Sequence, residues 1–176
     1  MKEQAITLGG GCFWCVEAVF ELVDGVIAVE NGYCNGHVLR PTYEAVCGGD
    51  TGHVEVVQVR FDADRISLRE VLEIFFVVHD PTTLNRQGND VGTQYRSGIY
   101  LHDAAQEAVA REVLAEANAA SGGRVVTELK LRENYSTAEA YHQHYYAQHP
   151  NAGYCAYVVA PKVEKFKRTF RARVKA

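Results

Sequence analysis

The sequence has no hydrophobic run long enough for a membrane-spanning helix, which needs about 18 consecutive apolar residues. Its first residues, Met1-Lys2-Glu3-Gln4, lack the pattern of a signal peptide. A strong charge excess is also missing, because 18 basic side chains stand against 22 acidic ones and the net charge is −4. Such a balance argues against nucleic acid as the main partner. We therefore expect a cytoplasmic protein without nucleic-acid or membrane partners.

Cysteines are few, and their number is odd. Five cysteines in a chain without a secretory signal indicate free thiols rather than a disulfide scaffold. Cys12 and Cys15 form one Cys-x-x-C pair, but a structural zinc site would need a second close pair, which the sequence lacks. His142 and His144 do not replace it, because residues two apart on a helix point to different faces. We expect no metal and no bound cofactor.

The chain has the size and composition of one domain. It has 176 residues, 47% of them hydrophobic, without a repeat or a low-complexity linker, and we expect a single domain over residues 1–176. Strand patterns at 5–8, 26–33, 53–61 and 97–101 alternate with helical patterns that begin at Cys12 and at the capping box Ser67-x-x-Glu70. This order predicts an α+β fold, a two-layer α/β sandwich. Its ferredoxin-like βαββαβ core would have a mainly antiparallel or mixed sheet and additional helices.

The second half of the chain predicts further elements around this core. A helix begins at Asp103 and stops at Gly122, and 127–131 favours a strand. Ser136-x-x-Glu139 predicts the cap of a helix that carries Tyr141 and Tyr145. A basic amphipathic helix is expected over about 161–175, with a solvated basic face and a docked apolar stripe of Val163, Phe166, Phe170 and Val174.

Cys12 is the strongest candidate for a reactive residue. It follows a short strand and the glycines that end at Gly11, and it lies at the first turn of a predicted helix. Unpaired backbone N–H groups and the helix dipole stabilise a thiolate at such a position and lower the pKa of the thiol. The alternative is that Cys12 is a buried cysteine that behaves as a small hydrophobic residue.

Glu55 is a candidate proton donor. Period-two alternation in the strand places it on the apolar face with Val57, Val59 and Phe61. A carboxyl group there would be desolvated and its pKa raised, so that it can donate a proton to an oxygen leaving a substrate. The alternative is a strand end where Glu55 is exposed to water.

Other residues are suited to substrate binding or to a second redox step. The polar loop 86–96 favours contact with a substrate, although a solvated surface loop has the same composition. Phe13 and Trp14 are suited to wall an apolar pocket or to fill the core. Cys155 lies in a late, flexible stretch, where a mobile second thiol is suited to form a disulfide, although a cysteine in a loop is usually incidental.

Several motifs together resemble the A-type peptide methionine sulfoxide reductases. The resemblance runs in order from about residue 5 to residue 161, and the combination is highly specific. The motifs are Gly11-Cys12-Phe13-Trp14, Pro41-Thr42-Tyr43, Gly52-His53-x-Glu55, His79-Asp80-Pro81, the stretch from Gln87-Gly88-Asn89-Asp90 to Gln94-Tyr95-Arg96-Ser97, and Gly153-Tyr154-Cys155.

The resemblance implies a role for each matched residue. Cys12 matches the nucleophile that attacks the sulfoxide sulfur, and Glu55 matches the donor that protonates the sulfoxide oxygen. Two tyrosines, Tyr43 and Tyr95, match those whose hydroxyls hold that oxygen. Asp90 matches the aspartate that helps to bind the substrate backbone. The aromatic wall that receives the substrate methyl group corresponds to Phe13 and Trp14.

The resemblance also implies the rest of the cycle, the repair of methionine after oxidative damage. The products would be methionine and a sulfenic acid on Cys12, and the family reduces the S epimer of the sulfoxide, free or in proteins. Cys155 matches the resolving cysteine, which condenses with the sulfenic acid to a disulfide. Thioredoxin would then reduce that disulfide. We expect a monomer, and the sequence leaves open whether protein-bound or free methionine sulfoxide is preferred.

Two features depart from the family pattern. Many relatives have glycine where this chain has Cys15, which makes Cys15 a second candidate resolving thiol, although a helix shared with Cys12 would limit its approach. The tail after Cys155 has no further cysteine, which argues against a relay to a third thiol there. Cys34 and Cys47 have no predicted role, and that of the basic C-terminal helix stays open.

Two other functions compete with this interpretation. One is a general thiol–disulfide oxidoreductase that uses Cys12 and Cys15, although no proline is an obvious partner for such a motif. This activity would not need the acid at Glu55. The other is a non-catalytic redox-sensing or binding module that holds oxidised peptides in its aromatic pocket, which predicts binding without turnover.

Overall fold

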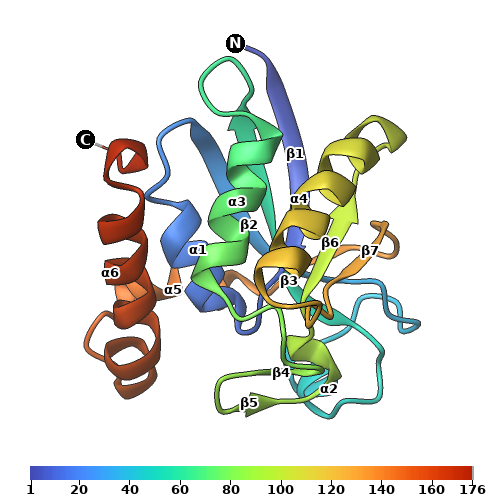
Figure 1. Cartoon of the computed structure of the whole chain (residues 1–176). Coiled ribbons are helices and arrows are strands. Elements are labelled where there is room, and N and C mark those ends of the chain that lie inside the picture. Colours follow the sequence, from blue (N-terminus) through green and yellow to red (C-terminus); the bar gives the residue numbers. More distant parts are fainter. Residues whose placement is uncertain (176) are drawn as a thin grey trace.

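The computed structural model describes residues 1–175, with a six-stranded sheet of order β7-β6-β1-β3-β2-β8 and a short hairpin of β4 and β5 (Figure 1). The strands are β1 (Glu3–Gly9), β2 (Val26–Cys34), β3 (Val54–Asp62), β4 (Arg86–Gln87), β5 (Asp90–Val91), β6 (Gly98–Leu101), β7 (Glu128–Leu131) and β8 (Ser136–Thr137). The helices are α1 (Phe13–Phe20), α2 (Tyr43–Cys47), α3 (Leu68–Val78), α4 (Glu107–Ala120), α5 (Tyr145–Gln148) and α6 (Ala160–Thr169).

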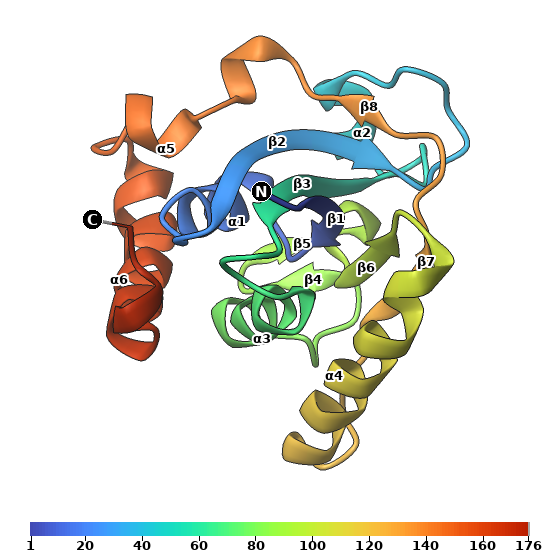
Figure 2. The ribbon, with the colours of Figure 1, turned by 90° about the horizontal axis from the view of Figure 1, so that it is seen from above.

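The first part of the chain forms the expected βαββαβ core from β1, α1, β2, β3, α3 and β6. Its strands pair antiparallel in the order β6-β1-β3-β2, which is the ferredoxin-like arrangement, and β7 extends the sheet by parallel pairing with β6. Seen from above, α1, α3 and α4 lie on one side of the sheet, and α6 lies beside α1 (Figure 2). Within residues 1–175, no helix combines the length and the apolar character that crossing a membrane requires.

Side-chain caps start two of the helices where the sequence predicts them. Ser67 Oγ accepts the N–H of Glu70, and the Glu70 carboxylate accepts the N–H of Ser67, which completes the capping box of α3. Asp103 Oδ1 accepts the N–H of Gln106 at 3.2 Å and starts the 3₁₀ turn that leads into α4.

Both faces of β3 are covered at its start. The face toward the helices contributes to the main core with Val57, Val59 and Phe61. The opposite face belongs to a smaller cluster, whose buried members are Cys34, Val54, Val56 and Tyr100. A polar side chain on this part of β3 is therefore shielded from water whichever way it points, and Glu55 lies on the same face as the helix-facing set.

The two long loops contain short elements that the sequence did not indicate. Residues 32–52 include α2, which Thr42 caps by accepting the N–H of Ala45 at 3.1 Å. Residues 80–96 include the β4-β5 hairpin and a 3₁₀ turn at Thr93–Tyr95. These elements fix the polar residues of both loops near the end of β1.

The helix expected from Ser136 is absent, and this prediction was wrong. We call residues 132–159, between β7 and α6, the strap. Here Ser136 lies in β8, which pairs with β2, and 3₁₀ and α-helical turns follow at Ala140–His142 and α5. The Gln143 side chain pairs with the Asn31 backbone on β2, accepting its N–H and donating to its C=O, both at 2.9 Å. These contacts with the edge of the sheet override the local helical pattern.

The C-terminal helix is shorter than expected. A π-helical turn at Cys155–Val159 leads into α6, which ends at Thr169 rather than near residue 175. Beyond it, Arg173 C=O accepts the N–H of Asp24 at 2.7 Å, and Lys175 N–H donates to Leu22 C=O at 2.8 Å. Backbone pairing with the end of α1 thus replaces the last helical turn, although Val163 and Phe166 are buried as the stripe predicts.

Candidate active site

The turn between β1 and α1 positions Cys12. Gly11 adopts φ +93°, and a Cβ there would lie 2.5 Å from Gln87 Cγ, so this position requires glycine. Cys12 is the N-cap of α1, with a non-helical backbone (ψ 126°), and it is only 7% exposed. The strand, the glycines and the helix start are therefore arranged as the sequence predicts.

Glu55 lies beside this helix start. Its Oε1 accepts the N–H of Phe13 at 3.3 Å, and its side chain is 1% exposed. Within residues 1–175, Oε2 has no hydrogen-bond partner. Burial raises the pKa of Glu55 to about 8, with a further contribution from the negative charge of Asp90, while the Phe13 N–H lowers it. The expected desolvated face is confirmed, and the carboxyl group is mostly protonated at neutral pH.

The environment of Cys12 differs from the sequence expectation. Burial raises the pKa of its thiol well above the usual range, and the Cys15 thiol and a charge on Glu55 add to this effect. Only the hydrogen bond from the N–H of Trp14 acts in the expected direction and lowers it. The helix start thus does not give the Cys12 thiol a low pKa in the free protein, because the effect of burial is larger. A protonated Glu55 removes one of the opposing charges.

Two tyrosines complete the polar side of the site, and each comes from one of the long loops. Tyr43 lies on α2 and Tyr95 in the 3₁₀ turn, and both are half-buried. Burial raises the pKa of each phenol, and the charge of Glu55 raises both further. Both phenols therefore lie within the electrostatic reach of the Glu55 carboxyl group. Both hydroxyls stay protonated at neutral pH and can donate hydrogen bonds.

Aromatic rings form the apolar side. Phe13 stacks with Tyr43 at 6.4 Å between ring centroids, and Trp14 stacks on Tyr145 of the strap at 3.9 Å. Trp14 Nε1 also donates to His142 Nδ1 at 3.2 Å. Phe13 and Trp14 thus belong to one aromatic cluster with Tyr43, and the strap supplies its outer layer.

The strap adds functional candidates that sequence reasoning missed. The His142 ring packs 4.3 Å from the Tyr43 ring, and its buried Nε2 has no partner among the described residues. Glu139 Oε1 accepts the Tyr33 hydroxyl and Oε2 the N–H of Tyr43, both at 2.9 Å, which holds Tyr43 in place. In the sequence, Glu139 belongs to the Ser136 motif that predicts a helix cap, and His142 suggests only a metal ligand. We find no periodicity in the sequence that would have identified either.

Asp90 and Cys155 are linked through Tyr154. The Tyr154 hydroxyl donates to Asp90 Oδ2 at 2.5 Å and lies 4.0 Å from Cys15 Sγ. Cys155 follows directly, is fully buried, and has a pKa raised by burial and by the charge of Cys15. All five cysteines are free thiols. The structure therefore brings Cys155 to the same end of α1 as the other candidates, with Cys15 as its neighbour.

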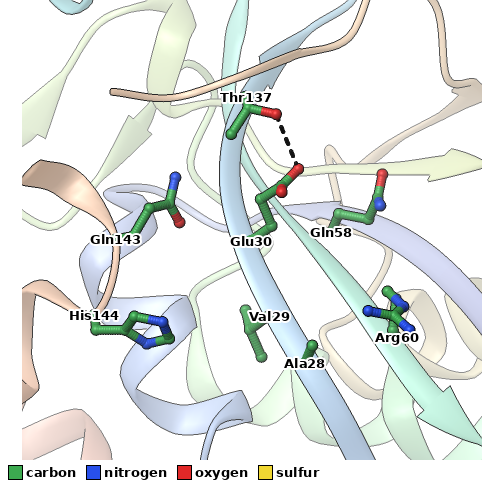
Figure 3. A pocket seen from close by; sticks show the side chains of 8 residues that line it. All are labelled: Ala28, Val29, Glu30, Gln58, Arg60, Thr137, Gln143 and His144. Carbon is green, nitrogen blue, oxygen red and sulfur yellow. Dashed lines mark hydrogen bonds between the residues drawn. The ribbon is translucent and has the colours of Figure 1, made fainter. Parts of the chain in front are cut away.

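A surface hollow and Cys34 lie apart from this chemistry, whereas Cys47 borders it. A surface hollow of about 230 Å³ on β2 and β3 has no cysteine among its lining residues, and its Glu30 accepts the Thr137 hydroxyl (Figure 3). Cys34 is buried on the far face of the sheet. Neither it nor the hollow combines a nucleophile with an acid. Cys47 is exposed at the end of α2, where its thiol interacts with Tyr43 and with the charge of Glu55.

A thiol-dependent reductase needs a thiol that becomes oxidised and a neutral acid that protonates the departing oxygen. The fold and the site of this protein define that class. A profile described as Peptide methionine sulfoxide reductase matches residues 4–174, and the chain belongs to that family. It is an oxidoreductase that reduces methionine sulfoxide to methionine.

Known relatives support this assignment along the whole chain. The peptide methionine sulfoxide reductase MsrA of Saccharolobus solfataricus is 56% identical over 172 residues, covering 98% of this chain and 97% of that protein. Reduced Mxr1 from Saccharomyces cerevisiae superposes with a TM-score of 0.83 at 39% identity, over 88% of this chain and 90% of that one. Mxr1 in complex with Trx2 gives 0.59 at 28% identity, over 82% and 85%.

Proposed function

We propose that Cys12 and Glu55 together reduce the S epimer of methionine sulfoxide. Cys12 Sγ attacks the electrophilic sulfur while Glu55 gives its proton to the sulfoxide oxygen. The oxygen passes to Cys12 as methionine leaves, so the substrate sulfur gains two electrons and Cys12 becomes a sulfenic acid. The proton lost by the Cys12 thiol restores Glu55. The observation that carries this proposal is the buried Glu55 carboxyl group on the N–H of Phe13, next to Cys12, with no partner for Oε2 among the described residues.

The neighbouring residues explain how the sulfoxide is oriented. The hydroxyls of Tyr43 and Tyr95 donate to the oxygen as negative charge builds on it, which favours the transition state. The methyl group rests against Phe13 and Trp14, since an aromatic surface suits an apolar group. Asp90 lies at the rim and is suited to bind the substrate backbone. A fixed oxygen side and a fixed methyl side admit one epimer only.

The oxidised enzyme must then be reduced. Cys155 ends up in the disulfide that an external dithiol attacks, and thioredoxin is the proposed reductant. The complex of the similar Mxr1 with Trx2 supports this partner. The substrates are free methionine sulfoxide and oxidised proteins. A cytoplasmic location and a monomeric state stay predictions from the sequence.

Turnover of the two separated epimers tests the proposal. Wild type, Cys12→Ser and the control Cys34→Ala are incubated with each epimer, thioredoxin, thioredoxin reductase and NADPH, and methionine is measured. We expect wild type and Cys34→Ala to reduce only the S epimer, and Cys12→Ser to lose more than roughly 1,000-fold in rate, as removal of a nucleophile does. Reduction of neither epimer by wild type, or activity in Cys12→Ser, would contradict it.

A further inference from the structure

Cys15 lies where a thiol can react with Cys12. The N–H of Cys15 donates to the C=O of Cys12 at 3.1 Å, which closes a four-residue turn at the start of α1. Such a turn brings its end Cα atoms within about 7 Å, and a disulfide needs about 4.4 to 6.8 Å. Because Cys12 is the N-cap and its backbone is not helical, it is not bound to helical geometry. The shared helix therefore limits Cys15 less than the sequence implied.

Cys15 also faces the strap. Its Sγ lies 4.0 Å from the hydroxyl of Tyr154, the residue before Cys155. The charge of Cys15 is felt at the Cys155 thiol, and both side chains belong to the same buried cluster as Cys12. Cys15 thus shares a turn with Cys12 and lies beside the residue that precedes Cys155.

The electrostatics of the thiol pair favour Cys15 as the attacking group. The neighbouring Cys12 thiol lowers the pKa of Cys15, and the positive charge of Lys162 on α6 and the Tyr154 hydroxyl lower it further, although burial opposes them. The contributions of Lys162 and Tyr154 remain when Cys12 has become a sulfenic acid, whereas burial raises the pKa of Cys155, the other thiol that can attack. The attacking thiolate is therefore formed more easily on Cys15 than on Cys155.

We propose that Cys15 resolves the sulfenic acid of Cys12 and then passes the disulfide to Cys155. The Cys15 thiolate attacks Cys12 Sγ, the S–O bond breaks, and the oxygen leaves as hydroxide that takes up a proton to become water. The Cys155 thiolate then attacks Cys15 Sγ, which releases the Cys12 thiolate and forms the Cys15–Cys155 disulfide. Two thiols are oxidised for each sulfoxide reduced, and the external dithiol restores both. This relay rests on the proposed function.

The relay explains what Cys155 adds. A Cys12–Cys15 disulfide would be shielded, because these side chains are 7% and 1% exposed. Cys155 is buried as well, but it belongs to the strap, where the nearby Tyr157 is 85% exposed. Moving the disulfide onto the strap places it on a segment that an external dithiol can approach.

Trapping the thiols after one turnover tests the relay. Reduced wild type, Cys15→Ser, Cys155→Ser and Cys34→Ala react with one round of the S epimer without reductant. Acid then stops the reaction, and peptide mass mapping identifies disulfides. A cyclic 1,3-diketone added to a parallel sample marks sulfenic acid. Methionine is measured in each sample, and one equivalent shows that a variant is folded and that the first step is intact.

The expected products differ between the variants. Wild type and Cys34→Ala give the Cys15–Cys155 disulfide, and Cys155→Ser gives the Cys12–Cys15 disulfide. Cys15→Ser keeps the sulfenic acid on Cys12, and its thioredoxin-dependent turnover falls roughly 100-fold, as expected when a reacting group is misplaced. If Cys15→Ser makes no methionine, Cys15→Ala takes its place.

Other products overturn the relay. A Cys12–Cys155 disulfide formed in Cys15→Ser or its alanine counterpart at the wild-type rate would show that Cys155 reacts directly. A persistent sulfenic acid in Cys155→Ser would show that Cys15 does not attack. Failure of wild type to make any methionine would instead refute the proposed function, so the two failures are distinguishable.

Discussion

Cys12 and Glu55 lie at the ends of regular elements of the core, whereas Cys155 lies on the strap, in the π-helical turn that follows its mostly irregular part. The part that carries Cys12 and Glu55, here called the catalytic half, is fixed by the antiparallel pairing of β1 and β3 and by the start of α1. The strap is held by side chains: Glu17 of α1 accepts the N–H groups of His144 and Tyr145 at 2.8 and 3.3 Å. Attack on the sulfoxide needs fixed geometry, while transfer of a disulfide needs a thiol that can move.

The largest expected effect is that of Glu55→Gln, in the catalytic half, on the rate of methionine formation. Glutamine has nearly the same shape but has no proton to give, so we expect methionine formation to fall roughly 100- to 10,000-fold, the range of general acid catalysis. Wild-type activity should also fall as the pH rises past about 8, where Glu55 ionises, and this limb should vanish in the variant. Single-turnover rates from pH 6 to 10 measure both effects.

Exposed Glu116→Gln, on α4, is the matched control and should behave as wild type. Unchanged methionine formation in Glu55→Gln would assign the proton to another donor. The catalytic half would then no longer be defined by the Cys12–Glu55 pair.

Two carboxyl groups, one in each half, should affect stability with opposite dependence on pH. Burial raises the pKa of Glu55 to about 8, so the folded state holds this proton more tightly than the unfolded chain does. Wild type therefore loses stability as the pH rises from about 4.5 to 8. Relative to wild type, Glu55→Gln should gain roughly 3 to 5 kcal/mol in unfolding free energy between pH 5 and 9.

Glu139 of the strap should show the opposite sign. Burial raises its pKa, but the N–H of Tyr43 and the Tyr33 hydroxyl outweigh this effect, and the net shift is downward. Its contribution is present above about pH 4.5 and is lost as the pH falls through the folded pKa. Glu139→Gln should therefore cost stability at pH 7 and approach wild type in acid. Urea unfolding across pH 4 to 9 tests both variants, and slopes of the same sign would contradict the contrast.

The same division separates what the sequence reveals from what it hides. The strand and glycine pattern before Cys12, the alternation around Glu55 and the capping box at Ser67 are local signals, and the structure confirms each as an element of the fold. The strap depends on contacts between residues far apart in the chain, such as Gln143 with Asn31 on β2. A local pattern cannot encode such a contact, and for this reason the pattern at Ser136 predicts a helix cap where the fold has a strand.

The site follows the same rule. Family motifs point to Tyr43, Tyr95 and Asp90, but the links that hold them come from outside the motifs, through Glu139 and Tyr154. The lowered pKa that the sequence predicts for Cys12 is also wrong. The rule for helix starts does not include burial of the thiol, which raises its pKa. Local motifs thus identify the site residues, whereas their burial and the hydrogen bonds that hold them depend on the whole fold.

The smallest expected effect comes from loosening the strap alone. Gln143→Ala removes both hydrogen bonds that its side chain makes with the backbone of Asn31. Each is worth about 1 kcal/mol net, so the strap should open more often while the sheet and α1 keep their positions. Single-turnover methionine formation should stay within about twofold of wild type. Amide hydrogen exchange should accelerate in residues 132–159 and not in β1 or β3.

Regeneration should report this opening. Thioredoxin-dependent turnover should change several-fold in Gln143→Ala. The reason is that regeneration requires the Cys155 thiol on the strap to leave its buried position. Exposed Gln148→Ala in the same strap is the control and should match wild type. If Gln143→Ala instead slows methionine formation as much as regeneration, the strap is part of the catalytic frame. Movement of Cys155 and fixation of Cys12 would then not be separate tasks of the two regions.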